Sequence, residues 1–200
     1  MDFNDVQARL ERTMSSIKQS RELPSKENVK IKTQPTGGNT FETKITFGDS
    51  EESEISNKIM NILHNLANFK DNLKNAIQKK GLNPEVVEDA INKSIYLQVL
   101  IDLVNQEKHG YPLKKFKRSN KNPRIENVRQ AMQMTGKAGP TSFLIKLGEE
   151  GCFETKGDCT VVIEGDIVDE KGVLLFSLDT LIYTAQRKWE ELIKNNELAS

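Results

Sequence analysis

The residues from Glu85 to His109 constrain the fold of this chain more than any other stretch. An Asn-Pro pair precedes them, which is typical of a helix start because asparagine can cap the helix and proline is tolerated in its first turn. From Ile95 to Val104 the residues are apolar on nearly every side of such a helix. This pattern is typical of the central helix of a bundle, so the rest of the chain must supply partners that cover it.

The nearest partner is the segment that precedes this helix in the sequence. Apolar residues recur at helical spacing from Ile55 to Ile77, and Gly81 ends the pattern. Two helices joined by such a short loop are expected to pack antiparallel. We therefore expect a long antiparallel helical hairpin, followed by a basic loop, in a domain that spans residues 41–134.

The amino-terminal residues predict an arm and a linker. Residues 1–21 have the period of an amphipathic helix, and residues 22–40 mix Pro, Gly, Ser, Asn and Lys without a period. The apolar seam of the helix is narrow, so it requires one partner helix. That partner can be the body of this protein, a second copy in a homodimer, or a different protein. The seam consists of Phe3, Val6, Leu10, Met14 and Ile17.

The remaining segments predict strands and two further helices. Alternating residues in 41–47 predict a strand, and RIENVRQAMQM, which begins at Arg124, predicts a short helix. In residues 135–200, the runs SFLIKL, CTVVIEGDIV and VLLFS predict an antiparallel β meander, which the strand at 41–47 could join. A last helix follows and buries Trp189. The expected fold class is α+β, with the meander and the C-terminal helix packed on the hairpin as one domain.

Composition restricts the compartment and the kinds of site. The formal net charge is +0, so any attraction to nucleic acid must be local. No apolar run approaches the roughly 20 residues that span a bilayer, and the amino terminus lacks the apolar core of a signal peptide. We therefore expect a cytoplasmic protein without membrane contact. Cys152 and Cys159 are expected as reduced thiols, because two cysteines and two histidines make neither a disulfide framework nor a convincing zinc site.

A basic loop follows the central helix and is the candidate nucleic-acid interface. Its cations have no acidic neighbour in the sequence until Glu126, and Tyr111 and Phe116 lie among them. Cations near aromatic rings are suited to a phosphate backbone and to unstacked bases, although a solvated basic loop has the same composition. The candidate nucleic-acid-binding residues are Lys108, Lys114, Lys115, Lys117, Arg118, Lys121 and Arg124.

A polar line on the central helix is the candidate catalytic site. Its members recur every three or four residues and therefore share one helical face. Either this face is a solvent-exposed edge, or it lines a cleft with Asn105, Lys108 and His109 at its mouth. An imidazole can move a proton, although a histidine at a helix end is also stabilised by the helix dipole alone. The line consists of Ser94, Gln98, Asp102, Asn105 and His109.

The segment IDLVNQEKHG, which begins at Ile101, resembles the end of the signature helix in HEPN-like helical proteins of bacterial conflict and toxin-antitoxin systems. The resemblance covers residues 55–118. It implies a helical bundle, dimerisation and, in active members, RNA cleavage by an arginine and a histidine four to six residues apart. His109 and Asn105 match this pattern, whereas no arginine stands at positions 102–104.

These features predict two classes of function. The first is an RNA-interacting protein with weak or vestigial metal-independent ribonuclease activity that depends on His109. The alternative is a non-enzymatic interaction module, such as an antitoxin-like or assembly subunit that uses the amino-terminal seam. We expect no cofactor and no bound metal, because the sequence lacks the motifs of dinucleotide, phosphate-loop and zinc-hydrolase sites.

Overall fold

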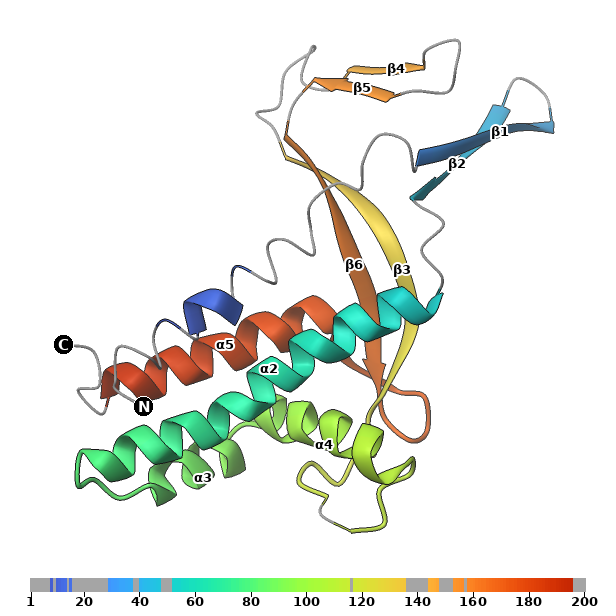
Figure 1. Ribbon diagram of the computed structural model, residues 1–200. Coiled ribbons are helices and arrows are strands. Elements are labelled where there is room, and N and C mark those ends of the chain that lie inside the picture. The colour runs from blue at the N-terminus through green and yellow to red at the C-terminus, as the bar shows by residue number, and fades with distance from the viewer. Residues whose placement is uncertain are drawn as a thin grey trace. The chain divides into compact units, whose positions relative to one another are not determined.

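The chain combines helices and strands, which confirms the predicted α+β class (Figure 1). The computed structural model describes residues 8, 10–13, 15, 29–37, 40–47, 52–115, 117–135, 144–147, 153–156 and 158–195. Its helices are α2 (Glu52–Lys79), α3 (Glu85–Asn92), α4 (Ile95–His109) and α5 (Leu178–Asn195). Its strands are β1 (Val29–Gly37), β2 (Thr40–Phe47), β3 (Arg124–Thr135), β4 (Leu144–Leu147), β5 (Phe153–Lys156), β6 (Asp158–Val168) and β7 (Leu174–Ser177).

The chain divides into two compact units. The helical unit consists of Met1–Ile17, Ser56–Val128 and Glu164–Ser200. The strand unit consists of Lys18–Ile55 and Arg129–Ile163. All the candidate site residues predicted from the sequence belong to the helical unit.

The second half of the helical hairpin is two helices rather than one. We expected a single helix over Glu85 to His109, but α3 ends at Asn92 and α4 begins at Ile95. Ser94 has an extended backbone, and its hydroxyl accepts a hydrogen bond from the backbone N–H of Leu97. The chain therefore restarts as a new helix at Ser94, because serine is a strong N-terminal cap that satisfies a free backbone donor of the next turn.

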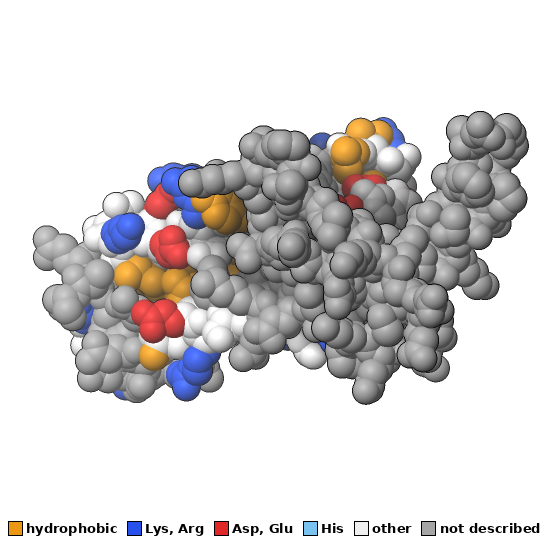
Figure 2. All heavy atoms as spheres, turned by 90° about the horizontal axis from the view of Figure 1, so that it is seen from above, with side chains coloured by type: hydrophobic (Ala, Val, Ile, Leu, Met, Phe, Trp, Pro, Cys, Tyr) orange, Lys and Arg blue, Asp and Glu red, His pale blue; other side chains and the backbone are white. Residues whose placement is uncertain are grey.

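The core of the helical unit lies between α2, α4 and α5. Trp189 of α5 is fully buried, as predicted, and its indole N–H donates to the backbone oxygen of Leu66 in α2 over 3.0 Å. Its ring centroid lies 6.3 Å from that of Phe69. Leu100 of α4 is also fully buried, and α5 contacts α3, α4 and β7. At the left of Figure 2 the described helical surface has a hydrophobic band between acidic and basic side chains.

The meander is partly as predicted. β6 and β7 pair antiparallel through the expected turn, in which Asp169 Oδ1 accepts from the backbone N–H groups of Lys171 and Val173. The strand order is β3-β6-β7, whereas β4 pairs with β5 and β2 pairs with β1. The meander is therefore completed by β3, and the prediction that 144–147 belongs to it was wrong. The strand at 41–47, which could have joined the meander, pairs with β1 instead.

Three predictions of local structure need correction. RIENVRQAMQM was expected as a short helix but forms β3. Asn127 within it has a left-handed backbone (φ 53°), which a right-handed helix does not allow. The Asn127 side-chain amide donates to Asp166 of β6 over 2.8 Å, so the neighbouring strand decides the conformation. β1 lies within the predicted linker 22–40, and β5 lies within a predicted turn.

The amino-terminal arm is described at a few positions only. Ala8, Leu10–Thr13 and Ser15 are helical, and Leu10 is 6% exposed within the single chain. The other seam residues lie outside the described residues, as do Cys152 and the side chain of Cys159. Among the described helices, none is both long enough and apolar enough to cross a membrane.

Candidate functional site

A buried carboxylate on α4 holds the basic loop in place. Asp102 is 1% exposed, and its two oxygens accept hydrogen bonds from the backbone N–H groups of Arg118 and Ser119, each over 2.8 Å. The Ser119 hydroxyl donates a third bond, over 2.6 Å. Hydrogen bonds to a charged acceptor are shorter and stronger than neutral ones, so Asp102 fixes this part of the loop against the helix.

The end of the loop is fixed to the β6–β7 turn. The buried Asn122 donates to the Glu170 carboxylate over 2.7 Å, and the backbone N–H of Glu170 donates to the backbone oxygen of Lys121 over 3.0 Å. Asn120 and Asn122 have left-handed backbones, with φ of 55° and 44°. Asparagine tolerates this conformation better than most residues with side chains, which explains why asparagine suits both positions.

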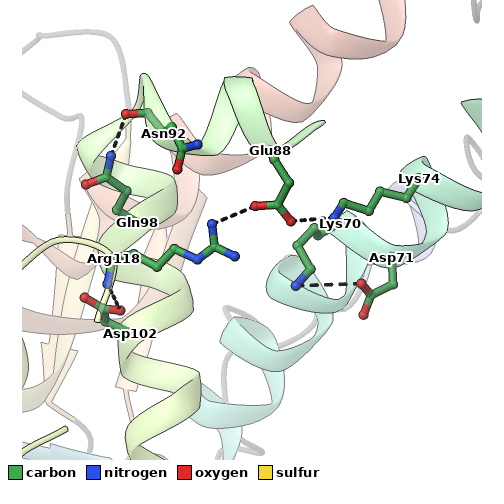
Figure 3. Close-up of polar contacts among 8 residues, drawn as sticks. All are labelled: Lys70, Asp71, Lys74, Glu88, Asn92, Gln98, Asp102 and Arg118. Atoms are coloured by element: carbon green, nitrogen blue, oxygen red, sulfur yellow. Dashed lines mark hydrogen bonds and ion pairs between the residues drawn. The ribbon is translucent and has the colours of Figure 1, made fainter. Parts of the chain in front are cut away.

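Arg118 points from the loop towards α3 and pairs with Glu88 (Figure 3). Its Nη1 lies 2.6 Å from Glu88 Oε2, and Lys74 of α2 donates to the other carboxylate oxygen over 2.5 Å. Burial raises the pKa of Glu88, but the hydrogen bonds and charges of Lys74 and Arg118 outweigh it and lower the pKa below 4.5. Glu88 thus links three segments, α2, α3 and the loop.

These contacts border a cleft of about 690 Å³ in the helical unit. α4 contributes Ile101, Asn105 and His109 to its walls, while α2 and α3 contribute one residue each and the loop contributes two. The lining residues include three cations, two amides and an imidazole, and no carboxylate. This composition favours an anionic ligand over a cation or a purely apolar one. The lining residues are Lys70, Asn92, Ile101, Asn105, His109, Lys117 and Arg118.

The structure separates the polar line of α4 into residues with different roles. Ser94 is the helix cap, Gln98 donates to the backbone oxygen of Asn92, and Asp102 holds the loop. Only Asn105 and His109 line the cleft. The line is therefore not simply a solvent-exposed edge, and its last two members lie where a ligand can reach them.

The basic residues predicted to bind nucleic acid also divide into groups. Lys117 and Arg118 line the cleft. Arg124 instead lies 3.0 Å from Glu126 and over the ring of Tyr111, at 5.5 Å from its centroid. The remaining four cations are exposed residues that do not line the cleft, namely Lys108, Lys114, Lys115 and Lys121.

Sequence reasoning missed three residues of this site. Lys70 and Asn92 line the cleft, and Glu88 pairs with Arg118 behind it. Each lies on a helical face with an ordinary mixture of polar residues, so no local signal distinguished them. Only the packing of α2 and α3 beside α4 brings them to the loop.

No family model, curated protein or solved structure matches this chain.

The ion pairs of Glu88 predict a pH-dependent contribution to stability. Because its folded-state pKa is lowered, the carboxylate stabilises the fold fully above the unfolded value of 4.5, and this contribution is lost as the pH falls through the folded value. Glu88→Gln should lower the free energy of unfolding at pH 7, and the difference from the wild type should shrink below pH 4.5. Urea denaturation from pH 7 to pH 3 measures both quantities, and a difference that does not change with pH would contradict the assignment.

Proposed function

We propose that this protein binds RNA, with the cleft and the basic loop beside it as the interface. The observation that carries the proposal is the cleft lining, in which Lys70, Lys117 and Arg118 converge with two side-chain amides and no carboxylate. Cationic and amide N–H donors of this kind bind the phosphate groups of a nucleic acid. A protein with net charge +0 needs a local concentration of cations to attract RNA, and this region supplies one.

The exposed lysines around the cleft support the proposal. Within the described part of the chain, no carboxylate lies within ion-pair distance of Lys108, Lys114, Lys115 or Lys117. Unpaired ammonium groups can replace the counterions of a phosphate backbone, and release of those ions drives association. Tyr111 is exposed beside them; Arg124 lies over its ring, and the part of the ring that stays exposed can contact a base.

A second activity, weak cleavage of the bound RNA, is favoured by the shared position of His109 and Arg118. Both line the cleft, together with Asn105. His109 can take the proton of a ribose 2′-hydroxyl, and that oxygen then attacks the adjacent phosphorus. The bond from phosphorus to the 5′-oxygen breaks, the 5′-oxygen takes up a proton from water, and Arg118 can stabilise the charge on the phosphate. The resemblance to HEPN-like proteins supports this role, and Arg118 would supply from the loop the guanidinium that is absent from positions 102–104.

The alternative class, an interaction module that uses the amino-terminal seam, has less support. Leu10 is the one seam residue with a described side chain, and the chain itself already covers it. A homodimer through this seam, or the binding of another protein to it, stays a prediction. The RNA proposal is favoured because the cleft is open to a ligand.

Neutralising the lysines should weaken RNA binding in a salt-dependent way. In the variant tested, Lys108, Lys114, Lys115 and Lys117 are all replaced by Gln. We expect its slope of log K against log[salt] to be shallower by up to about 3, since each phosphate contact with a single strand contributes roughly 0.7. Fluorescence anisotropy with a labelled single-stranded RNA measures the slope. The control variant changes four exposed lysines elsewhere, Lys58, Lys93, Lys171 and Lys194, to Gln. Absence of binding at low salt, or equal slopes in both variants, would contradict the proposal.

Cleavage should depend on His109 and on no added metal. His109→Ala is expected to lower the cleavage rate by about 100-fold or more, because it removes the group that moves the proton. The rate is measured on labelled RNA with EDTA present, and the products should carry 2′,3′-cyclic phosphates. His64→Ala is the matched control, since His64 pairs with Glu107 and does not line the cleft. Unchanged cleavage by a folded His109→Ala variant would refute the assignment.

A further inference from the structure

The donors of the cleft converge from four segments of the chain. Lys70 comes from α2, Asn92 from α3, Asn105 from α4 and Lys117 with Arg118 from the loop. A flat surface that follows an RNA backbone would instead spread its cations along one direction. The arrangement therefore suits a compact anion that several walls contact at once.

Lys70 is available to such an anion. The nearest carboxylate oxygen among the described residues belongs to Asp71, 3.7 Å from Lys70 Nζ, which is beyond hydrogen-bond distance (Figure 3). Asp71 is 68% exposed, so solvent screens this contact. By contrast, the Lys70 side chain is only 24% exposed. A half-enclosed ammonium without a close partner gains more from a bound anion than a fully solvated one.

Arg118 can keep its structural contacts and still bind a ligand. One of its terminal nitrogens bonds to Glu88, and its backbone N–H bonds to Asp102. The guanidinium has further N–H donors, which lie in the same plane as the first. Because Glu88 and Asp102 hold both ends of the residue, little conformational freedom is lost when an anion binds.

The cations at the cleft are only partly balanced by carboxylates. Lys70, Lys74, Lys117 and Arg118 are positive, and Glu88 and Asp71 are the carboxylates that pair with members of this group. Glu88 is shared by Lys74 and Arg118, so Lys117 is the one cation of the four with no carboxylate partner among the described residues, and Lys70 has only the screened contact with Asp71. A phosphodiester carries one negative charge, whereas a phosphomonoester carries about −1.5 to −2 at pH 7 and has three terminal oxygens.

We propose that the cleft is a binding site for a terminal phosphomonoester, the phosphorylated end of an RNA strand, while the exposed lysines contact the phosphodiesters that follow. This inference rests on the proposed RNA-binding function and names the part of the ligand that enters the cleft. Lys70, Lys117 and Arg118 hold the phosphate oxygens, and the amides of Asn92 and Asn105 donate from the sides. Ile101 supplies an apolar wall for the adjoining ribose.

The test compares short RNA strands that differ only at one end. Eight-nucleotide strands labelled at the 3′ end carry a 5′-phosphate or a 5′-hydroxyl, and strands labelled at the 5′ end carry a 3′-phosphate or a 3′-hydroxyl. We expect one phosphorylated end to bind the full-length protein at least tenfold more tightly than its hydroxyl counterpart in fluorescence anisotropy. Adenosine monophosphate should compete with that strand, and adenosine should not.

The variants locate the preference in the cleft. Lys70→Gln should remove the tenfold difference, whereas Lys58→Gln, an exposed lysine on the same helix, should retain it. Equal affinity for both kinds of end, or a preference that persists in Lys70→Gln, would overturn the phosphomonoester site while leaving RNA binding intact. If adenosine monophosphate binds and Lys70→Gln abolishes its binding, but no strand binds, the site stands and the proposed RNA function is wrong.

Discussion

The buried carboxylate of Asp102 is the interaction on which the site depends. It is almost completely excluded from water and accepts three hydrogen bonds from Arg118 and Ser119. A charge in the interior is costly unless its hydrogen-bonding capacity is used, and here the backbone of the loop uses it. The loop is thereby tied to α4, in which the residues from Leu97 to Val104 are buried except Gln98, although the loop is rich in lysine.

The cleft follows from this anchor and from the break between α3 and α4. Because Ser94 starts a new helix, the end of α3 presents Asn92 beside α4, where Gln98 bonds to the backbone oxygen of Asn92. Asp102 sets the backbone of Arg118, and Glu88 sets its guanidinium. Three packed helices and one anchored loop thus place cations around a common space, which a flexible basic loop alone would not do.

The sequence predicted those parts that depend on local pattern. The helices of the hairpin and the buried Trp189 follow from the period of the apolar residues and from the helix caps. The turn between β6 and β7 follows from its glycine. The prediction of a helix at β3 was wrong because RIENVRQAMQM is compatible with both the helical and the strand period. Its pairing with β6 decides for the strand. His109 and Asn105 were found from their spacing, whereas Lys70, Asn92 and Glu88 depend on contacts between distant segments that no local pattern reveals.

Amide hydrogen exchange at Arg118 and Ser119 tests the anchoring role of Asp102 most directly. Hydrogen bonds to a charged acceptor contribute about 1.5–3 kcal/mol, so Asp102→Ala should make these two amides exchange about 10- to 100-fold faster. The buried amides of α4, such as that of Leu100, should stay protected and show that the helix is intact. Ser119→Ala removes the hydroxyl's bond to Asp102 and the bond it accepts from the backbone N–H of Lys121, but leaves both amide bonds to Asp102, and should have a smaller effect. Unchanged exchange at both amides in Asp102→Ala would contradict the account.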